Sequence, residues 1–184
     1  MDTSTLIDRQ ACADLLARYC RAIDRLDEDL LRSVFHPDSE HHHGFHGPSS
    51  APGEDDFVAF AFGFLSTCRY THHQLGSVLV EVDGDHARSE AYFTAYHRLR
   101  AASDPAAAPE AATSEMDYWV GGRYLDRLEK REGAWRIVWR AGITDWTRLE
   151  PPAGAAVDTV EARFPPRRSR EDPVYGLFGP DGGA

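Results

Sequence analysis

The sequence is poor in lysine: Lys130 is the only one among 184 residues, and the formal net charge is −10. Surfaces that bind nucleic acids or anionic membranes need clustered positive charge, so this balance argues against both partners. No stretch approaches the ~18–20 apolar residues of a membrane span. The first residues also lack the basic and apolar regions of a secretory signal. We therefore expect a cytoplasmic protein with no nucleic-acid or membrane partner.

Cysteine is equally scarce. The chain has three cysteines and no CxxC pair, which is typical of free thiols in a reducing compartment. Glycine-rich phosphate loops and the GxSxG and HExxH motifs are absent as well. What is present, 42% hydrophobic and 27% charged residues, is the composition of a globular domain.

Two helices are predicted near the N-terminus. Apolar side chains recur every fourth residue over 7–23, which is typical of an amphipathic helix, and Thr3 or Ser4 is its expected N-cap. A short second helix is predicted over 30–35, stopped by Pro37.

A polar strand is predicted over 39–47, and a third helix over 54–67. The aromatic side chains Phe57, Phe60 and Phe64 form a stripe on this helix, which we expect in the core and partly as an apolar pocket wall. Beyond it the apolar period changes from 3.6 to 2, which indicates strands. These four strands are expected over 78–82, 87–99, 116–128 and 134–146.

Helices followed by an antiparallel meander indicate an α+β fold. We expect a cone-shaped α+β barrel, in which the N-terminal helices pack on a strongly curved, mainly antiparallel sheet and the open end forms a pocket. Residues 1–149 are the expected domain, and the alanine-rich segment 101–114 is an expected mobile loop. The proline-rich residues 150–184 are an expected extension, lying on the surface or partly disordered.

Several side chains in this layout could carry chemistry. Tyr19 and Asp24 are five residues apart near the end of the first helix, so they diverge by ~140° and can both reach a mouth where that helix ends. His73 precedes the first meander strand, His97 ends the second, and Arg140 lies in the last. Each also has a plain structural interpretation: a solvated carboxylate, structural histidines, or a surface ion pair.

The run of histidines from His41 to His46 is a candidate metal site, because His41 and His43 point to the same side of a strand. It has no distant Cys or His partner at a recognised spacing, however. We therefore interpret it as a polar strand that lines the pocket through His43, and expect no metal and no cofactor.

Taken together, the motifs resemble the SnoaL-like branch of the nuclear-transport-factor-2-like superfamily. They are YxxxxD at 19–24, HxxxS at 73–77 and WxxxxRxxxxDW at 135–146, and the resemblance covers about residues 5–148. Members of this superfamily include hexachlorocyclohexane dehydrochlorinase, bile acid 7α-dehydratase and scytalone dehydratase. Ser77 stands where relatives often have Asn, and the segment 100–115 is longer than theirs.

The resemblance implies roles for these residues. His73 would be a general base that Asp24 orients, since a neutral imidazole can accept a proton at neutral pH. Arg140 would stabilise developing enolate or leaving-group charge, and Tyr19 would donate a hydrogen bond to a carbonyl or a departing hydroxyl. His97 would correspond to a second active-site histidine.

The implied function is that of a cofactor-independent lyase of the dehydratase or dehydrohalogenase type, acting on a small hydrophobic cyclic substrate. Its pocket would be lined by His97, Phe60, Phe64 and His43. Two alternatives are an isomerase or cyclase of polyketide, steroid or terpenoid type, and a non-catalytic small-molecule-binding module with the same fold. By analogy with relatives, we expect a homo-oligomer, either a trimer or a dimer.

Overall fold

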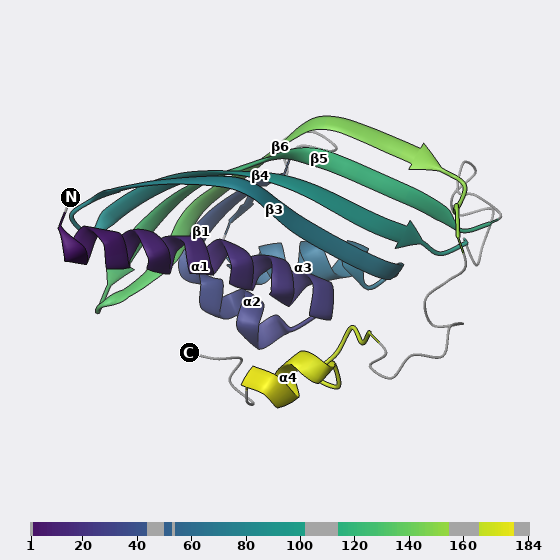
Figure 1. Cartoon of the computed structure of the whole chain (residues 1–184), viewed down its shortest axis with the longest axis horizontal. Helices are drawn as coiled ribbons and strands as arrows, with labels where there is room; N and C mark the ends of the chain where they lie inside the picture. Colours follow the sequence, from purple (N-terminus) through teal and green to yellow (C-terminus); the bar gives the residue numbers. More distant parts are fainter. Residues whose placement is uncertain (1, 44–49, 53, 102–113, 155–165, 179–184) are drawn as a thin grey trace.

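A curved sheet with helices along its concave side forms the body of the protein (Figure 1). This computed structural model describes residues 2–43, 50–52, 54–101, 114–154 and 166–178. The helices are α1 (Thr3–Arg25), α2 (Glu28–Val34), α3 (Glu54–Leu65) and α4 (Pro173–Phe178). The strands are β1 (Phe35–His43), β2 (Ser50–Pro52), β3 (Cys68–Asp83), β4 (His86–Leu99), β5 (Met116–Arg131) and β6 (Ala134–Glu150).

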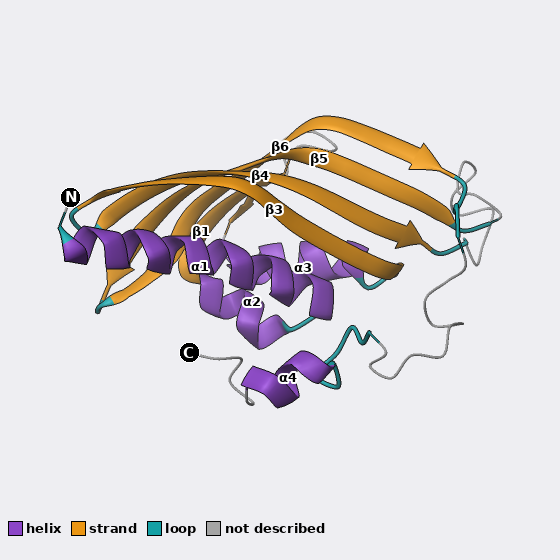
Figure 2. Cartoon of the chain, viewed as in Figure 1, coloured by secondary structure: helices purple, strands orange, loops and turns teal. Residues whose placement is uncertain are grey.

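The sheet has the order β2-β1-β6-β5-β4-β3, with β2 and β3 at its edges. Figure 2 shows β3 to β6 side by side. Strands β3 to β6 form the predicted antiparallel meander, while β1 pairs in parallel with β6. Helix α1 packs along β3, and α3 lies against β1. The predicted cone-like α+β fold, with N-terminal helices on a curved, mainly antiparallel sheet, is thus confirmed.

The helix ends differ from the sequence prediction. The N-cap of α1 is Asp2, not Thr3 or Ser4, because its carboxylate accepts the Thr5 N–H at 2.8 Å. Helix α2 ends before Phe35, whose backbone is already extended and begins β1. Pro37 therefore lies inside a strand, and the prediction that it stops the second helix was wrong.

Strand β3 begins at Cys68, well before the predicted residue 78, so His73 lies within this strand rather than ahead of it. The strand is interrupted by a register shift between Leu75 and Val78. Such a bulge breaks the alternation of side chains, and this is why the apolar pattern revealed only the second half of the strand.

Two register shifts bend the centre of the sheet over the helices. One lies between Gly121 and Gly122, and the other between Arg127 and Leu128. A Cβ atom on Gly121 would lie 2.1 Å from the indole of Trp146, so only glycine allows this ring to cross the neighbouring strand so closely.

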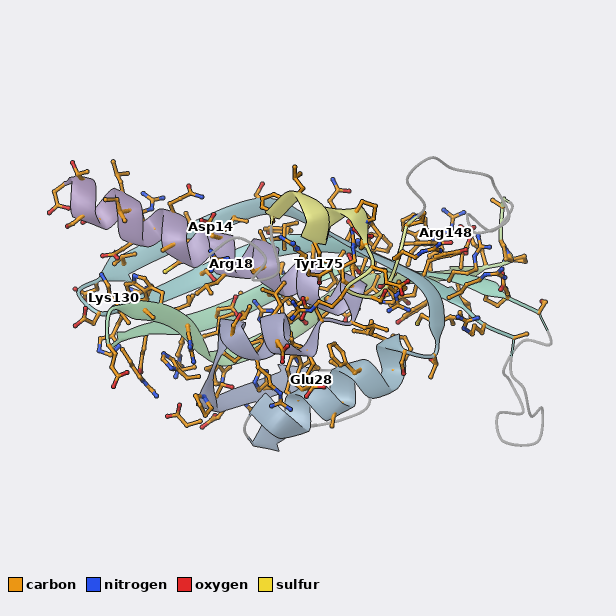
Figure 3. All side chains as sticks on the ribbon, turned by 90° about the horizontal axis from the view of Figure 1, so that it is seen from below. Asp14, Arg18, Glu28, Lys130, Arg148 and Tyr175 are labelled. Carbon is orange, nitrogen blue, oxygen red and sulfur yellow. The ribbon has the colours of Figure 1, made fainter. Side chains whose placement is uncertain are left out.

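The C-terminal residues 166–178 return to the helices. Helix α4 lies below α2 in Figure 1, and Figure 3 shows Tyr175 beside the end of α1. The expected mobile loop at 101–114 falls almost entirely outside the described residues, as do 155–165 of the extension. Among the described helices, none has the length and apolar character needed to cross a membrane.

Candidate active site

The centre of the site is a contact between His73 and Asp24. Nδ1 of the imidazole lies 2.8 Å from Oδ1 of the carboxylate, and each side chain is only 6% exposed. Two more groups donate to the same carboxylate: the Thr71 hydroxyl to Oδ1 at 2.9 Å and the His73 backbone N–H to Oδ2 at 2.8 Å. The alternative of a solvated carboxylate at position 24 is therefore excluded.

Local structure explains why these groups meet. Asp24 lies in the last turn of α1, which packs along β3. Because β3 is an edge strand, its outward N–H groups have no strand partner, and the N–H of His73 is satisfied by Asp24 instead. Thr71 and His73 are two residues apart and point to the same side, toward the helix. One carboxylate thus covers the strand edge and holds the ring.

The hydrogen bonds define the protonation of the pair. Burial alone raises the pKa of Asp24, but hydrogen bonds and charge from His73, together with Thr71, outweigh it and hold the pKa below its ordinary value. A carboxylate only accepts, so the His73 ring proton lies on Nδ1. Among the described residues, none hydrogen-bonds Nε2 of this ring. Its lone pair is therefore available to a ligand.

A second histidine lies beside the first. The His97 ring meets His73 edge to face, with centroids 5.2 Å apart, and also contacts Phe64 and Tyr118 at 5.5 and 5.7 Å. Burial, followed by the charge of His73, lowers the pKa of His97 to about 3. The ring is therefore neutral at pH 7. Its Nδ1 is buried and has no partner within the described part of the chain.

Two phenylalanines of α3 lie one turn apart on its exposed side, and Phe64 contacts the His97 ring. Phe60 and Phe64 are 50% and 44% exposed, so the prediction that they belong to the core was wrong. The reason is that the buried face of α3 follows Phe57, Ala61 and Leu65, and Phe60 and Phe64 lie beside this face rather than on it. Both rings nevertheless contact site histidines: Phe64 lies against His97, and Phe60 lies 6.1 Å from His43. They form an apolar rim beside the dyad.

The predicted pocket residue His43 lies on β1, which pairs directly with β6. Its ring stacks on Phe57 at 4.9 Å, and His41 stacks on the same ring at 4.0 Å. Gly142 faces His43 across the strands, where a Cβ atom would lie 2.9 Å from Nδ1. Charge from Arg140 adds to burial in lowering the pKa of His43 to about 3.

The other two predicted catalytic residues form a separate buried cluster. Arg140 and its partner Asp126 are both 0% exposed, joined from Nε to Oδ1 at 2.6 Å and from Nη2 to Oδ2 at 2.9 Å. The guanidinium lies over the rings of both Tyr19 and Tyr124, at 4.1 and 4.6 Å from their centroids. The alternative of a surface ion pair at Arg140 is thus excluded.

The electrostatics of this cluster follow from its burial. Burial raises the pKa of Tyr19 to about 12, so its hydroxyl stays protonated. Desolvation opposes the charge on Arg140, but Asp126 outweighs it and raises the pKa above its ordinary value. Within the described residues, neither Tyr19 nor Arg140 hydrogen-bonds His73 or Asp24, and Nη1 of Arg140 has no partner.

The histidine run of β1 and the main surface hollow both lie apart from the dyad. The parallel rings of His41 and His43 have Phe57 stacked on both, and the described residues contain no group of three or more His, Cys, Asp or Glu that could hold a metal ion. His46 lies outside the described residues. A hollow of about 870 Å³ lies elsewhere, among strand residues that include Glu81 and Arg127.

Sequence reasoning missed several members of these clusters. Thr71 lies on the same side of β3 as His73, but both residues were predicted to precede the strand, so alternation along it did not identify Thr71. Asp126 and Tyr124 lie in a segment recognised only as a strand, and nothing local marks one as the partner of Arg140 and the other as its cover. Tyr118, against His97, carries no local signal either.

Comparisons with known proteins support the fold described above. The model of the SnoaL-like domain matches residues 4–141. No curated protein matches the sequence significantly.

Solved structures show the same fold at low sequence identity. A type 2 hexachlorocyclohexane dehydrochlorinase has a TM-score of 0.69 at 18% identity, covering 84% of this chain and 97% of its own. A candidate scytalone dehydratase from Novosphingobium aromaticivorans has a TM-score of 0.66 at 22% identity, covering 85% and 99%. A protein of unknown function from Mycobacterium tuberculosis has a TM-score of 0.61 at 24% identity, covering 86% and 83%.

Proposed function

This chain belongs to the SnoaL-like domain family, and on that premise we propose that it is a cofactor-independent lyase of the dehydratase or dehydrohalogenase type. In the proposed reaction, Nε2 of His73 takes a proton from a carbon of the substrate. The electron pair of that C–H bond forms the new C=C bond, and a hydroxide or halide leaves the adjacent carbon with its bonding pair. Asp24 stabilises the imidazolium formed at His73.

The observation that carries the proposal is the buried Nδ1–Oδ1 contact of 2.8 Å between His73 and Asp24. The contact fixes the tautomer in which Nε2 is basic, and it supplies a counter-charge where the positive charge develops. A module that only binds a small molecule has no need of a buried base oriented in this way. A general base of this kind contributes about 10²–10⁴-fold to a rate.

The surroundings of the dyad favour a hydrophobic cyclic substrate. The rim formed by Phe60 and Phe64 offers apolar ring surface, and Tyr118 and His97 extend it toward His73. His97 is neutral at pH 7, so it can orient a polar substituent without adding charge. A hexachlorocyclohexane dehydrochlorinase is among the structural neighbours, and a halogenated or hydroxylated ring fits the same chemistry.

For the second cluster we propose a supporting role. Nη1 of Arg140 is the atom available to an oxygen or halide that gains negative charge, and the Tyr19 hydroxyl would donate to the same group. His43, whose pKa burial lowers to about 3, would line the pocket as a neutral ring. We also propose that the chain acts as a homo-oligomer in the cytoplasm, with 150–184 as an extension of the domain 1–149.

A proton-transfer isomerase or cyclase is the second candidate. It uses the same base, with the difference that the proton returns to another atom of the substrate and no group departs. Nε2 of His73, which no described residue hydrogen-bonds, would serve both reactions as the base. The product distinguishes them, since elimination releases water or halide.

The test is incubation of the protein with a panel of cyclic hydroxy-ketones and cyclic halides, following halide release and products by mass spectrometry. We expect His73→Ala and Asp24→Asn to lower turnover of an accepted compound by at least about 10²-fold. The neighbouring His72 is exposed, so His72→Ala should retain the wild-type rate. Undiminished turnover by His73→Ala would falsify the proposed base, and binding without turnover across the panel would favour the non-catalytic module.

A further inference from the structure

The C-terminal strap, defined here as residues 166–178, places one arginine at the junction of three elements. Nη1 of Arg168 donates to the carbonyl of Leu65 at 2.8 Å and to that of Cys68 at 2.7 Å. Its Nε donates to the backbone carbonyl of Asp24 at 3.3 Å. A single guanidinium thus joins α1, the end of α3 and the start of β3.

Two of these three carbonyls belong to helix ends, where local structure leaves them without partners. The last four carbonyls of a helix have no intrahelical donor, and Asp24 and Leu65 lie in the last turns of α1 and α3. Both helix ends also carry partial negative charge, which a cation stabilises. Arg168 supplies donors and charge to both at once. Its charge, along with burial, helps to lower the pKa of His97.

Two of the three elements joined by Arg168 carry the dyad, and the third carries the rim beside it. Helix α1 carries Asp24. Strand β3 carries His73, five residues after Cys68 (73 − 68). Helix α3 carries Phe64, the rim residue in contact with His97. The distance between the Asp24 carboxylate and the His73 imidazole therefore depends on how α1 is held against the start of β3. Arg168 connects these two elements through their backbone carbonyls.

Three further contacts fasten the strap to the same region. Asp172 lies 3.2 Å from Nε of Arg25, the last residue of α1. The Tyr175 hydroxyl donates to Asp27 at 2.5 Å, and Arg170 reaches the same carboxylate at 3.0 Å. Asp27 is the N-cap of α2, so these contacts fix the corner between the first two helices. The strap is thus attached independently of the three carbonyls.

We propose that Arg168 is a positioning residue for the His73–Asp24 dyad, through which the C-terminal strap holds the end of α1 against β3. The inference rests on the proposed function. It goes beyond the family, because the family model ends at residue 141 and does not include this arginine. Arg168 contacts backbone rather than substrate, so it acts on the reaction only through the separation of the two dyad residues.

The experiment needs no substrate, because the amide of His73 reports directly on Asp24. This N–H has the Asp24 carboxylate as its acceptor, so its hydrogen exchange measures how firmly the carboxylate is held. We compare amide exchange of full-length wild type with Arg168→Met, which keeps the apolar stem, and Arg168→Lys, which keeps the charge. Arg170→Met is the control, since it loosens the strap's contact with Asp27 and leaves Arg168 in place.

In Arg168→Met we expect the His73 amide to exchange about tenfold faster, the change expected for losing hydrogen bonds to a charged donor. The amide of Tyr124, in a central strand, should exchange at the wild-type rate. Arg168→Lys should give an intermediate His73 rate, and Arg170→Met the wild-type rate. If a compound from the panel is turned over, Arg168→Met should lower kcat with KM unchanged.

Three results overturn the inference: an unchanged His73 rate in Arg168→Met, equal acceleration at His73 and Tyr124, or the same effect from Arg170→Met. Should Arg168→Met fail to fold, Arg168→Lys decides, because wild-type exchange at His73 in that variant contradicts the proposal and selective acceleration supports it. If the exchange results hold and no compound is turned over, the positioning of the dyad stands and the proposed reaction fails.

Discussion

Replacing Asp24 with asparagine isolates the hydrogen bonding of the dyad from its packing, because the two side chains have the same shape. The carboxylate accepts three hydrogen bonds, two on Oδ1 and one on Oδ2. An amide has only one oxygen, so its NH₂ must face a donor in either orientation. It opposes the backbone N–H of His73 in one orientation, and Nδ1–H together with the Thr71 hydroxyl in the other.

The expected cost follows from these contacts. One charge-assisted hydrogen bond is worth about 1.5–3 kcal/mol, and leaving a buried donor unpaired costs about 1–3 kcal/mol. These effects overlap, so we expect Asp24→Asn to lower the free energy of unfolding by about 2–4 kcal/mol. In the second orientation, His73 can avoid part of the conflict by moving its proton to Nε2. That tautomer has no basic lone pair facing the substrate, and the same change costs about 10⁴-fold in the triad of serine proteases.

The assay is urea unfolding at pH 7, with the exposed Asp14→Asn on the same helix as control (Figure 3). An exposed change of this kind should stay within about 0.5 kcal/mol of wild type. The pKa of Asp24 is lower in the folded protein than its ordinary value of 3.8, so the carboxylate's contribution is fully present above that pH. It is lost as the pH falls through the folded pKa. A wild-type advantage that is absent at pH 7, or that grows on acidification, would refute the reasoning.

Two further predictions concern the buried pair of Arg140 and Asp126, and the contact between Gly142 and His43. Arg140→Met leaves the buried Asp126 without this arginine and should lower the free energy of unfolding in urea by about 3–5 kcal/mol. The control Arg88→Met removes an exposed ion pair and should lower it by less than about 1 kcal/mol. Similar losses in the two variants would contradict the burial of the Arg140–Asp126 pair. Gly142→Ala brings a Cβ to 2.9 Å from Nδ1 of His43 and should lower stability by about 1–3 kcal/mol while changing the chemical shifts of that ring, and unchanged shifts would show that the ring does not lie there.

Much of the fold was predictable because it depends on short-range patterns. The four-residue apolar period of α1 and the two-residue period of the meander strands needed no tertiary information. The predictions failed where tertiary placement overrides the pattern. Phe57 and Phe60 belong to one periodic stripe, yet only the first is covered, because whether a helix face is buried depends on what lies opposite it.

The Arg140–Asp126 pair of the candidate site depends on tertiary structure rather than on a local pattern. A regular hairpin in the register that pairs Leu128 with Ile137 would place Asp126 opposite Trp139. The bulge before Leu128 shifts the register by one residue, and Asp126 then faces Arg140. A one-residue slip moves a side chain to the other face of a sheet. The buried ion pair therefore depends on a bulge that no local residue marks.

The dyad needed a different kind of information again. Asp24 and His73 are 49 residues apart (73 − 24), and no periodicity within either segment fixes their separation. The resemblance to a family named both residues, but the physical cause of their contact is the unpaired edge of β3, whose outward N–H needs an acceptor. Arg168 lies farther still along the chain and satisfies carbonyls, which every residue carries, so the sequence holds no sign of which ones it will meet. Side chains that bind backbone at element ends are for this reason the part of a site that only a structure can assign.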